Sequence, residues 1–125
     1  MAQVIRAEKG PTPLGPYSHA IRAGDDLYVS GFVGIDPATG ELCSADVQAQ
    51  AAMALDHIAA VLEAASMSMQ NVVKTTIYLT DMNFFSAVNA VYAQRFGSNK
   101  PARSTVAVAG LPKGALVEID AIAKA

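Results

Sequence analysis

The spacing of apolar residues along this chain changes between two periods, and that change restricts the fold more than any other feature. Apolar residues recur every three or four positions over about 45–66 and again over about 83–96, which predicts two amphipathic helices. Ser44 and Asp81 are placed to cap the amino ends of these helices. Between the helices, alternation and β-branched residues over 72–79 predict a strand. Helices that alternate with strands favour a sheet covered by helices.

Shorter alternating segments on either side of this region add further strands. They lie at 3–7, 19–23, 26–33, 102–109 and 115–123. The last two are predicted to pair as a hairpin, because a short glycine-containing turn joins them. The predicted order is β-β-β-α-β-α-β-β. It favours an α+β domain in which two helices cover one face of a mixed sheet.

The composition bears on what covers the other face of that sheet. The 125 residues are enough for one domain, residues 1–125, with one hydrophobic core. Only 16% of them are charged, whereas an average soluble domain has about 25%. We therefore expect a second copy of the chain to bury the uncovered face, which makes the protein a homo-oligomer.

The charge balance and the apolar runs argue against several classes of protein. The net charge is −2 and no basic cluster is present, so binding to nucleic acid is not expected. No apolar run is long enough to span a membrane, and the first residues lack the order of a secretory signal. The single cysteine, Cys43, cannot form an internal disulfide. The expected location is the cytoplasm.

The histidines and the cysteine do not show the spacing of a catalytic or metal site. His57 follows Asp56 on the first helix and is expected on the surface. His19 is expected to have a structural role, with a place in a pocket wall as the alternative. Cys43 has no neighbouring base and is expected to be an unreactive thiol. No metal site is predicted.

One arginine and one glutamate in the last two strands are candidates for a joint role. Alternation places Arg103 on the same strand face as Thr105, and it points Glu118 away from the apolar residues of its own strand. The predicted hairpin brings Glu118 opposite Thr105. One interpretation is a cross-strand salt bridge, worth about 0–1 kcal/mol if exposed. The other is a site for a small α-substituted carboxylic acid, in which the guanidinium binds the carboxylate and Glu118 deprotonates a water.

Short motifs along nearly the whole chain carry a resemblance to a known family. They are Gly15-Pro16-Tyr17-Ser18, Val29-Ser30-Gly31, Asp36-Pro37-x-Thr39-Gly40, Val73-Lys74-Thr75-Thr76, Val88-Asn89-Ala90-Val91-Tyr92, Pro101-Ala102-Arg103-Ser104 and Val117-Glu118-Ile119. In this order and spacing they resemble the RidA (YjgF) family of reactive-intermediate deaminases.

The resemblance implies a chorismate-mutase-like α+β fold that assembles as a homotrimer, with three ligand clefts between subunits. It also implies the hydrolysis of reactive 2-imino or enamine acids, namely 2-iminobutanoate, 2-iminopropanoate and 2-aminoacrylate, to 2-oxo acids and ammonia without a cofactor. Such imines are released from serine and threonine by pyridoxal-phosphate dehydratases. Arg103 would hold the substrate carboxylate and Glu118 the attacking water. The residues implied to line or shape the cleft are Tyr17, Ser30, Gly31 and Asn89.

Two positions depart from the pattern of this family. Phe32 stands where many members have glutamine, and we expect its ring to narrow or dry the cleft and to alter the range of substrates. Thr105 stands where many members have cysteine. Its hydroxyl can still donate a hydrogen bond to a ligand, but it cannot supply a thiolate.

Three other functions compete with deamination. The first is a regulatory trimer that binds a 2-oxo or 2-imino acid through Arg103 without turnover. The second is a single-stranded RNA endoribonuclease or translation inhibitor, which the acidic net charge and the scarcity of aromatic residues disfavour. The third is a chaperone, suggested only by the apolar content.

Overall fold

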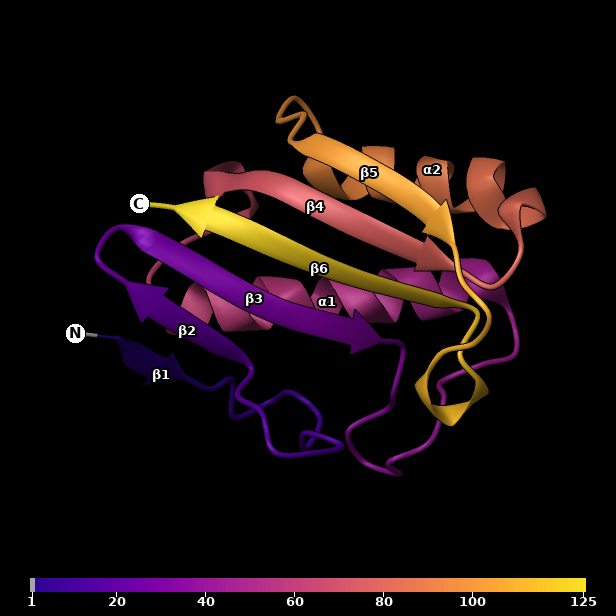
Figure 1. Ribbon diagram of the computed structural model, residues 1–125, viewed down its shortest axis with the longest axis horizontal. Coiled ribbons are helices and arrows are strands. Elements are labelled where there is room, and N and C mark those ends of the chain that lie inside the picture. The colour runs from indigo at the N-terminus through magenta and orange to yellow at the C-terminus, as the bar shows by residue number, and fades with distance from the viewer. Residues whose placement is uncertain (1) are drawn as a thin grey trace.

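Six strands form one mixed sheet in the computed structural model, which describes residues 2–125 (Figure 1). The strands are β1 (Gln3–Ile5), β2 (Ala20–Ala23), β3 (Asp26–Val33), β4 (Val72–Leu79), β5 (Ala102–Ala107) and β6 (Val117–Lys124). Their spatial order is β1-β2-β3-β6-β4-β5, and only β4 and β5 run parallel. The predicted order of elements along the chain is confirmed, and so is the mixed sheet.

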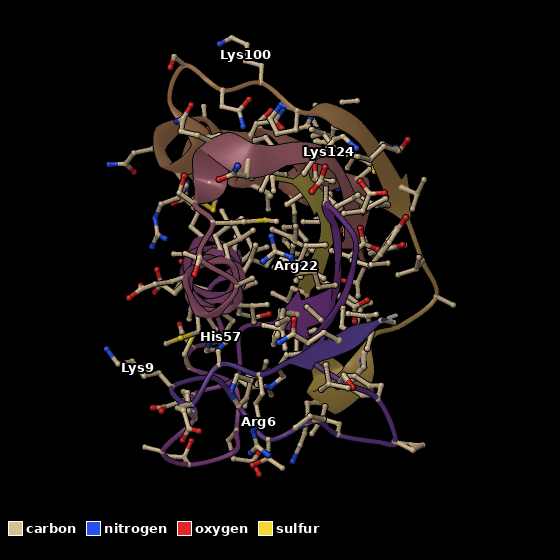
Figure 2. All side chains as sticks on the ribbon, turned by 90° about the vertical axis from the view of Figure 1, so that its left-hand side faces the viewer. Arg6, Lys9, Arg22, His57, Lys100 and Lys124 are labelled. Atoms are coloured by element: carbon tan, nitrogen blue, oxygen red, sulfur yellow. The ribbon has the colours of Figure 1, made fainter. Side chains whose placement is uncertain are left out.

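Both helices lie on one face of this sheet. They are α1 (Val47–Ala64) and α2 (Phe85–Phe96), and both pass behind the strands in Figure 1. In the side view of Figure 2, α1 is seen nearly end-on with the whole sheet to one side of it. Three short 3₁₀ turns, η1 (Met69–Asn71), η2 (Met82–Phe84) and η3 (Pro112–Gly114), complete the regular structure. The α+β class with two helices on one face is thus as predicted.

The helix caps differ from the sequence prediction at α1 and agree only in part at α2. Asp46, and not Ser44, caps α1: its carboxylate accepts the Ala49 N–H at 2.9 Å. Ser44 lies just outside the helix, where its hydroxyl accepts the Asp46 N–H. Either side chain suits a cap, and the point where the backbone turns helical decides between them. Asp81 caps η2, the turn that leads directly into α2, whereas α2 itself follows Phe84 without a side-chain cap, so the prediction holds for the turn and not for the helix proper.

The core lies between the helices and the sheet. Its largest fully buried apolar side chains come from α1 and the strands: Leu27, Leu55, Ile58, Leu62, Ile77, Leu79 and Ile119. Each contributes about 1.5–3 kcal/mol by leaving water. Gly34 lets α1 approach closely, because a Cβ there would lie 2.6 Å from the Cα of Gln50.

The predicted hairpin between β5 and β6 is wrong. The two strands do not pair, because β4 lies between them and pairs with both. β4, α2 and β5 form a parallel β-α-β unit, which puts β5 at the edge of the sheet. β6 buries every second side chain against the helices, whereas β5 buries none, so β6 is suited to the centre. The turn residues had indicated a change of direction, but they do not determine which strand is the partner.

The second face of the sheet, called the open face below, is covered by no helix in the described part of the chain (Figure 1). Tyr28 and Val106 on this face are 48% and 43% exposed. Asp120 lies between them in the sheet order, where its carboxylate accepts from the Tyr78 hydroxyl and the Thr76 N–H. No helix among residues 2–125 is long and apolar enough to cross a bilayer.

Candidate active site

Glu118 stands on the open face, near the point where β3 is irregular. The register between β3 and β6 shifts between Val29 and Phe32, which places Ser30 and Gly31 in a bulge beside Glu118. A Cβ at Gly31 would lie 2.5 Å from Glu118 Oε2, so any larger residue there would displace the carboxylate from this position. The Ser30 hydroxyl donates to the Ser18 carbonyl at 2.6 Å, and that bond joins the bulge to the preceding loop.

The carboxylate of Glu118 is unusually basic. Burial raises its pKa above the ordinary value, and repulsion from Asp120 raises it further. Among the described residues, no hydrogen bond to the carboxylate offsets these effects. Glu118 is therefore a proton acceptor whose oxygens are free to bind a water or a ligand.

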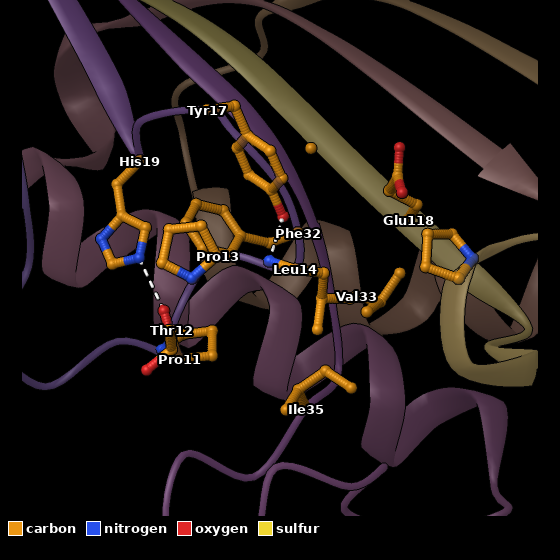
Figure 3. A pocket seen from close by; sticks show the side chains of 12 residues that line it. Pro11, Thr12, Pro13, Leu14, Tyr17, His19, Phe32, Val33, Ile35 and Glu118 are labelled. Carbon is orange, nitrogen blue, oxygen red and sulfur yellow. Dashed lines mark hydrogen bonds between the residues drawn. The ribbon is translucent and has the colours of Figure 1, made fainter.

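A rigid loop forms the other wall beside Glu118 (Figure 3). His19 holds the loop in place, since its Nε2–H donates to the Pro11 carbonyl at 2.7 Å and its Nδ1 accepts the Ala7 N–H at 3.1 Å. Tyr17 extends from the loop, and its hydroxyl accepts the Leu14 N–H at 3.2 Å. His19 thus has the structural role predicted for it, and it also contributes to a pocket wall.

Two adjoining spaces lie between this loop and the sheet. The more enclosed one measures about 30 Å³ and has mostly apolar walls (Figure 3). The outer one measures about 310 Å³, and we call it the Glu118 hollow. Four of the predicted site residues line the Glu118 hollow together: Tyr17, Ser30, Gly31 and Glu118.

Phe32 is part of the core and reaches only the enclosed space. Its side chain is 5% exposed and lies between two histidine rings, with ring centroids 5.3 Å from His19 and 5.6 Å from His57. The strand alternation turns it to the helix side, where it pairs in register with Ile119. The ring therefore does not extend into the Glu118 hollow.

The prediction that His57 lies on the surface is wrong. His57 is 4% exposed, faces the sheet from α1, and donates from Nε2 to the Ile35 carbonyl at 2.7 Å. Burial lowers its pKa, which favours the neutral ring. Asp56 does face solvent, where it pairs with Arg95 at 2.6 Å. Consecutive residues differ by about 100° around a helix, so an exposed neighbour does not make His57 exposed.

Arg103 lies on the opposite face of the sheet from Glu118. It pairs in register with Thr75, whose side chain is fully buried toward α2, whereas Glu118 pairs with Tyr78 on the open face. Because β4 separates the two strands and the side chains point to opposite faces, the predicted cross-strand salt bridge is wrong. One chain cannot present both groups to the same small molecule.

The surroundings of Arg103 form a second site. Asn89, Tyr92 and Arg103 are among the residues that line an open pocket of about 330 Å³, which we call the Arg103 pocket. The guanidinium Cζ lies 4.9 Å from the centre of the Tyr92 ring and 5.6 Å from that of Phe85. Thr105, two residues along the same strand face, has a buried hydroxyl with no hydrogen-bond partner among residues 2–125. From the sequence, Phe85 and Tyr92 count only among the periodic positions of the helix predicted over about 83–96, and their contact with Arg103 was missed.

The remaining candidates for chemistry, Cys43 and possible metal ligands, show no sign of a reactive or metal-binding site in the described part of the chain. Burial raises the pKa of the Cys43 thiol above its ordinary value, which keeps it protonated and unreactive. Within the described residues, no group of three or more histidine, cysteine or acidic side chains is arranged to hold a metal ion.

The chain is similar over nearly its full length to proteins of one family. A family model described as Endoribonuclease L-PSP matches residues 7–125. A RutC family protein of Pyrococcus horikoshii is 50% identical over 123 residues, which cover 98% of both proteins. The human 2-iminobutanoate/2-iminopropanoate deaminase is 46% identical over 121 residues, which cover 97% of this chain and 88% of the human protein. The crystal structure of E. coli TdcF with bound serine has a TM-score of 0.94 at 38% identity and covers 98% of both chains.

Proposed function

The chain belongs to the endoribonuclease L-PSP family, which includes the RidA proteins, and from this premise we propose that it is a 2-imino acid deaminase. It hydrolyses 2-iminobutanoate, 2-iminopropanoate and the related 2-aminoacrylate to 2-oxo acids and ammonia. Residues 1–125 act as a single domain with a chorismate-mutase-like fold, assembled as a homotrimer. The observation that carries the proposal is a free, basic carboxylate and a free guanidinium on opposite faces of one sheet.

The two half-sites meet between subunits. The open face of one chain, with its Glu118 hollow, packs beside the Arg103 pocket of the next chain, which gives three clefts per trimer. The exposed Tyr28 and Val106 and the low content of charged residues support burial of this face in an assembly. A substrate in the cleft would touch Tyr17 and Gly31 from one subunit and Asn89 and Thr105 from the next.

The reaction needs orientation and one proton acceptor. The Arg103 guanidinium binds the substrate carboxylate through two parallel hydrogen bonds. Glu118 takes a proton from a water whose oxygen attacks the C=N carbon, and a carbinolamine forms. Glu118 then returns this proton to the nitrogen, the C–N bond breaks, and ammonia leaves as the C=O bond forms and Glu118 takes up the hydroxyl proton. A protonated imine is already electrophilic, so positioning accounts for much of the acceleration.

A competition assay tests the proposal. Threonine dehydratase generates 2-iminobutanoate, semicarbazide traps it, and the protein is added. The wild-type protein should suppress the semicarbazone signal, whereas Arg103→Ala should not, and Arg103→Lys should retain part of the activity because it keeps the charge without the planar fork. An unchanged semicarbazone signal with wild-type protein would overturn the proposal.

Glu118→Gln separates catalysis from binding in the same assay. The amide is nearly isosteric but cannot accept the proton, so we expect turnover to fall about 10²- to 10⁴-fold. Binding of 2-oxobutanoate, measured by calorimetry, should persist. If wild type binds 2-oxobutanoate without turnover, the protein is instead a regulatory binding trimer.

The description of the family model makes ribonuclease activity the second candidate. The chain offers few cations for a phosphate backbone, with 9 lysines and arginines against 11 acidic residues. A salt-dependent shift and cleavage of single-stranded RNA by submicromolar protein would support it.

A further inference from the structure

Arg103 is held by aromatic rings and not by acceptors. Phe85, Asn89 and Tyr92 occupy positions i, i+4 and i+7 of α2, so they form one stripe along the helix. The two rings at the ends of this stripe both lie within cation–π range of the guanidinium, at 5.6 and 4.9 Å from Cζ. We call Phe85 and Tyr92 the aromatic bracket.

Two other arginines, Arg95 and Arg22, are held by oxygen acceptors. Arg95 pairs with Asp56 at 2.6 Å, and Arg22 donates to the Ala65 carbonyl at 2.8 Å. Within residues 2–125, Arg103 has neither an ion pair nor a hydrogen-bond acceptor, although it is half-buried. A ring face attracts a cation without occupying any of its five N–H donors. The bracket therefore fixes the guanidinium while leaving its donating edge free.

The Tyr92 ring of the bracket is fixed by contacts with the sheet and with its own helix. The Tyr92 hydroxyl shares a hydrogen bond of 2.7 Å with the hydroxyl of Thr75, which is fully buried on β4. The same ring packs against Phe96 with centroids 4.5 Å apart. Strand β4 thus sets the position of Tyr92, and Tyr92 sets the position of Arg103.

We infer that Phe85 and Tyr92 are positioning residues that preorganise Arg103 for an anionic ligand. They act through the guanidinium and need not touch the substrate. The inference rests on the proposed function, because it names the residues that make the carboxylate clamp effective. An unbracketed arginine side chain would sample many rotamers, and binding would have to restrict it.

Phe85 offers the clean test, because its side chain is 37% exposed and its loss should not unfold the chain. In Phe85→Leu, the KM for the imine and the Kd for 2-oxobutanoate should rise about two- to fivefold, because one exposed cation–π contact with Arg103 is lost. The change in kcat should be smaller, because Glu118 and its water are on a different chain. Phe85→Trp should restore both constants, since indole is the best cation–π partner.

Phe84→Leu is the matched control. Phe84 precedes Phe85 and packs partly buried against the core, and only Phe85 and Tyr92 lie over Arg103 in the described structure. This variant should lower the melting temperature without the rise in KM. A second variant, Tyr92→Phe, keeps the ring and should raise KM less than Tyr92→Leu does.

The outcomes separate the inference from the proposed function. An unchanged KM and Kd in Phe85→Leu, an equal rise in Phe84→Leu, or failure of Phe85→Trp to restore binding would each overturn the bracket while wild-type turnover stands. A wild-type protein that neither hydrolyses the imine nor binds 2-oxobutanoate would overturn both.

Discussion

The basicity of Glu118 comes from its position among a few neighbours. Gly31 lets the carboxylate lie close against the β3 backbone, which removes part of its hydration. Asp120, two residues along the same strand face, adds a second negative charge. Both effects favour the protonated acid, so the raised pKa has a cause in the fold and, in the proposed reaction, a use in the chemistry.

This cause predicts the pH dependence of turnover. Because Glu118 must be ionised to accept a proton, kcat/KM should fall as the pH is lowered through its raised pKa. Asp120→Asn removes the repelling charge, lowers that pKa, and should move the acidic limb of the profile to lower pH. The measurement is kcat/KM against pH for the two proteins.

Asp25→Asn serves as the control for this experiment, because Asp25 is an exposed acid in the turn between β2 and β3. Its profile should match that of the wild type. An equal displacement of the limb in both variants would show that net charge, and not the proximity of Asp120, controls the titration.

Individual residues were predictable from the sequence where strand alternation applied. The faces of Arg103 and Glu118 within their own strands follow from a period of two. The burial of His57 did not follow, because it depends on the Ile35 carbonyl and the Phe32 ring, which approach from other segments. The contact of Arg103 with Phe85 and Tyr92 was missed for the same reason.

Among the elements, α2 depends on one polar contact with the sheet. The hydrogen bond between Thr75 and Tyr92 is buried, so removing one partner leaves the other hydroxyl unpaired. Thr75→Val should therefore lower the free energy of unfolding by about 1–3 kcal/mol. Urea denaturation measures this change.

A double-mutant cycle isolates that bond from the change in packing. In a Tyr92→Phe background the hydroxyl is already absent, and Thr75→Val should cost less by about 0.5–1.5 kcal/mol. Additive losses would mean that the two hydroxyls do not stabilise each other.

The elements themselves were well predicted, and their pairing was not. The bounds of β3 and β4 agree with the predicted segments, and both helices lie where the 3.6-residue period put them. The error at β5 and β6 arose because a turn signal is local, whereas pairing depends on which edge of β4 each strand can reach. The β-α-β crossover brings β5 to one edge of β4, and β6, which has the larger apolar face, pairs with the other edge.

At the scale of the whole molecule, the placement of Arg103 and Glu118 makes a prediction about mixed assemblies. Arg103→Ala and Glu118→Gln chains should each be inactive alone. When they are co-expressed, about a quarter of the clefts in random trimers combine an intact Arg103 from one chain with an intact Glu118 from another. Activity should therefore reappear in the mixture, measured in the semicarbazide assay against each variant alone.

Separately purified variants that are mixed without exchange of subunits should stay inactive, which controls for contamination. A co-expressed mixture without activity would contradict a cleft shared between chains. Sequence reasoning could anticipate a shared cleft only through the family resemblance, because a strand pattern does not reveal what lies across an assembly.

Strand β4 joins the supports of both half-sites through two consecutive residues. Thr75 anchors the ring beneath Arg103 on one face, and the Thr76 N–H anchors the acid beside Glu118 on the other. The pleat of a strand fixes the offset between such neighbours. In the proposed trimer these two groups of one chain belong to different clefts, so a central strand of each chain links the acid of one cleft to the cation of the next. A substitution in the middle of β4 should therefore disturb two clefts at once, whereas a substitution in the loop that carries Tyr17 should disturb only one.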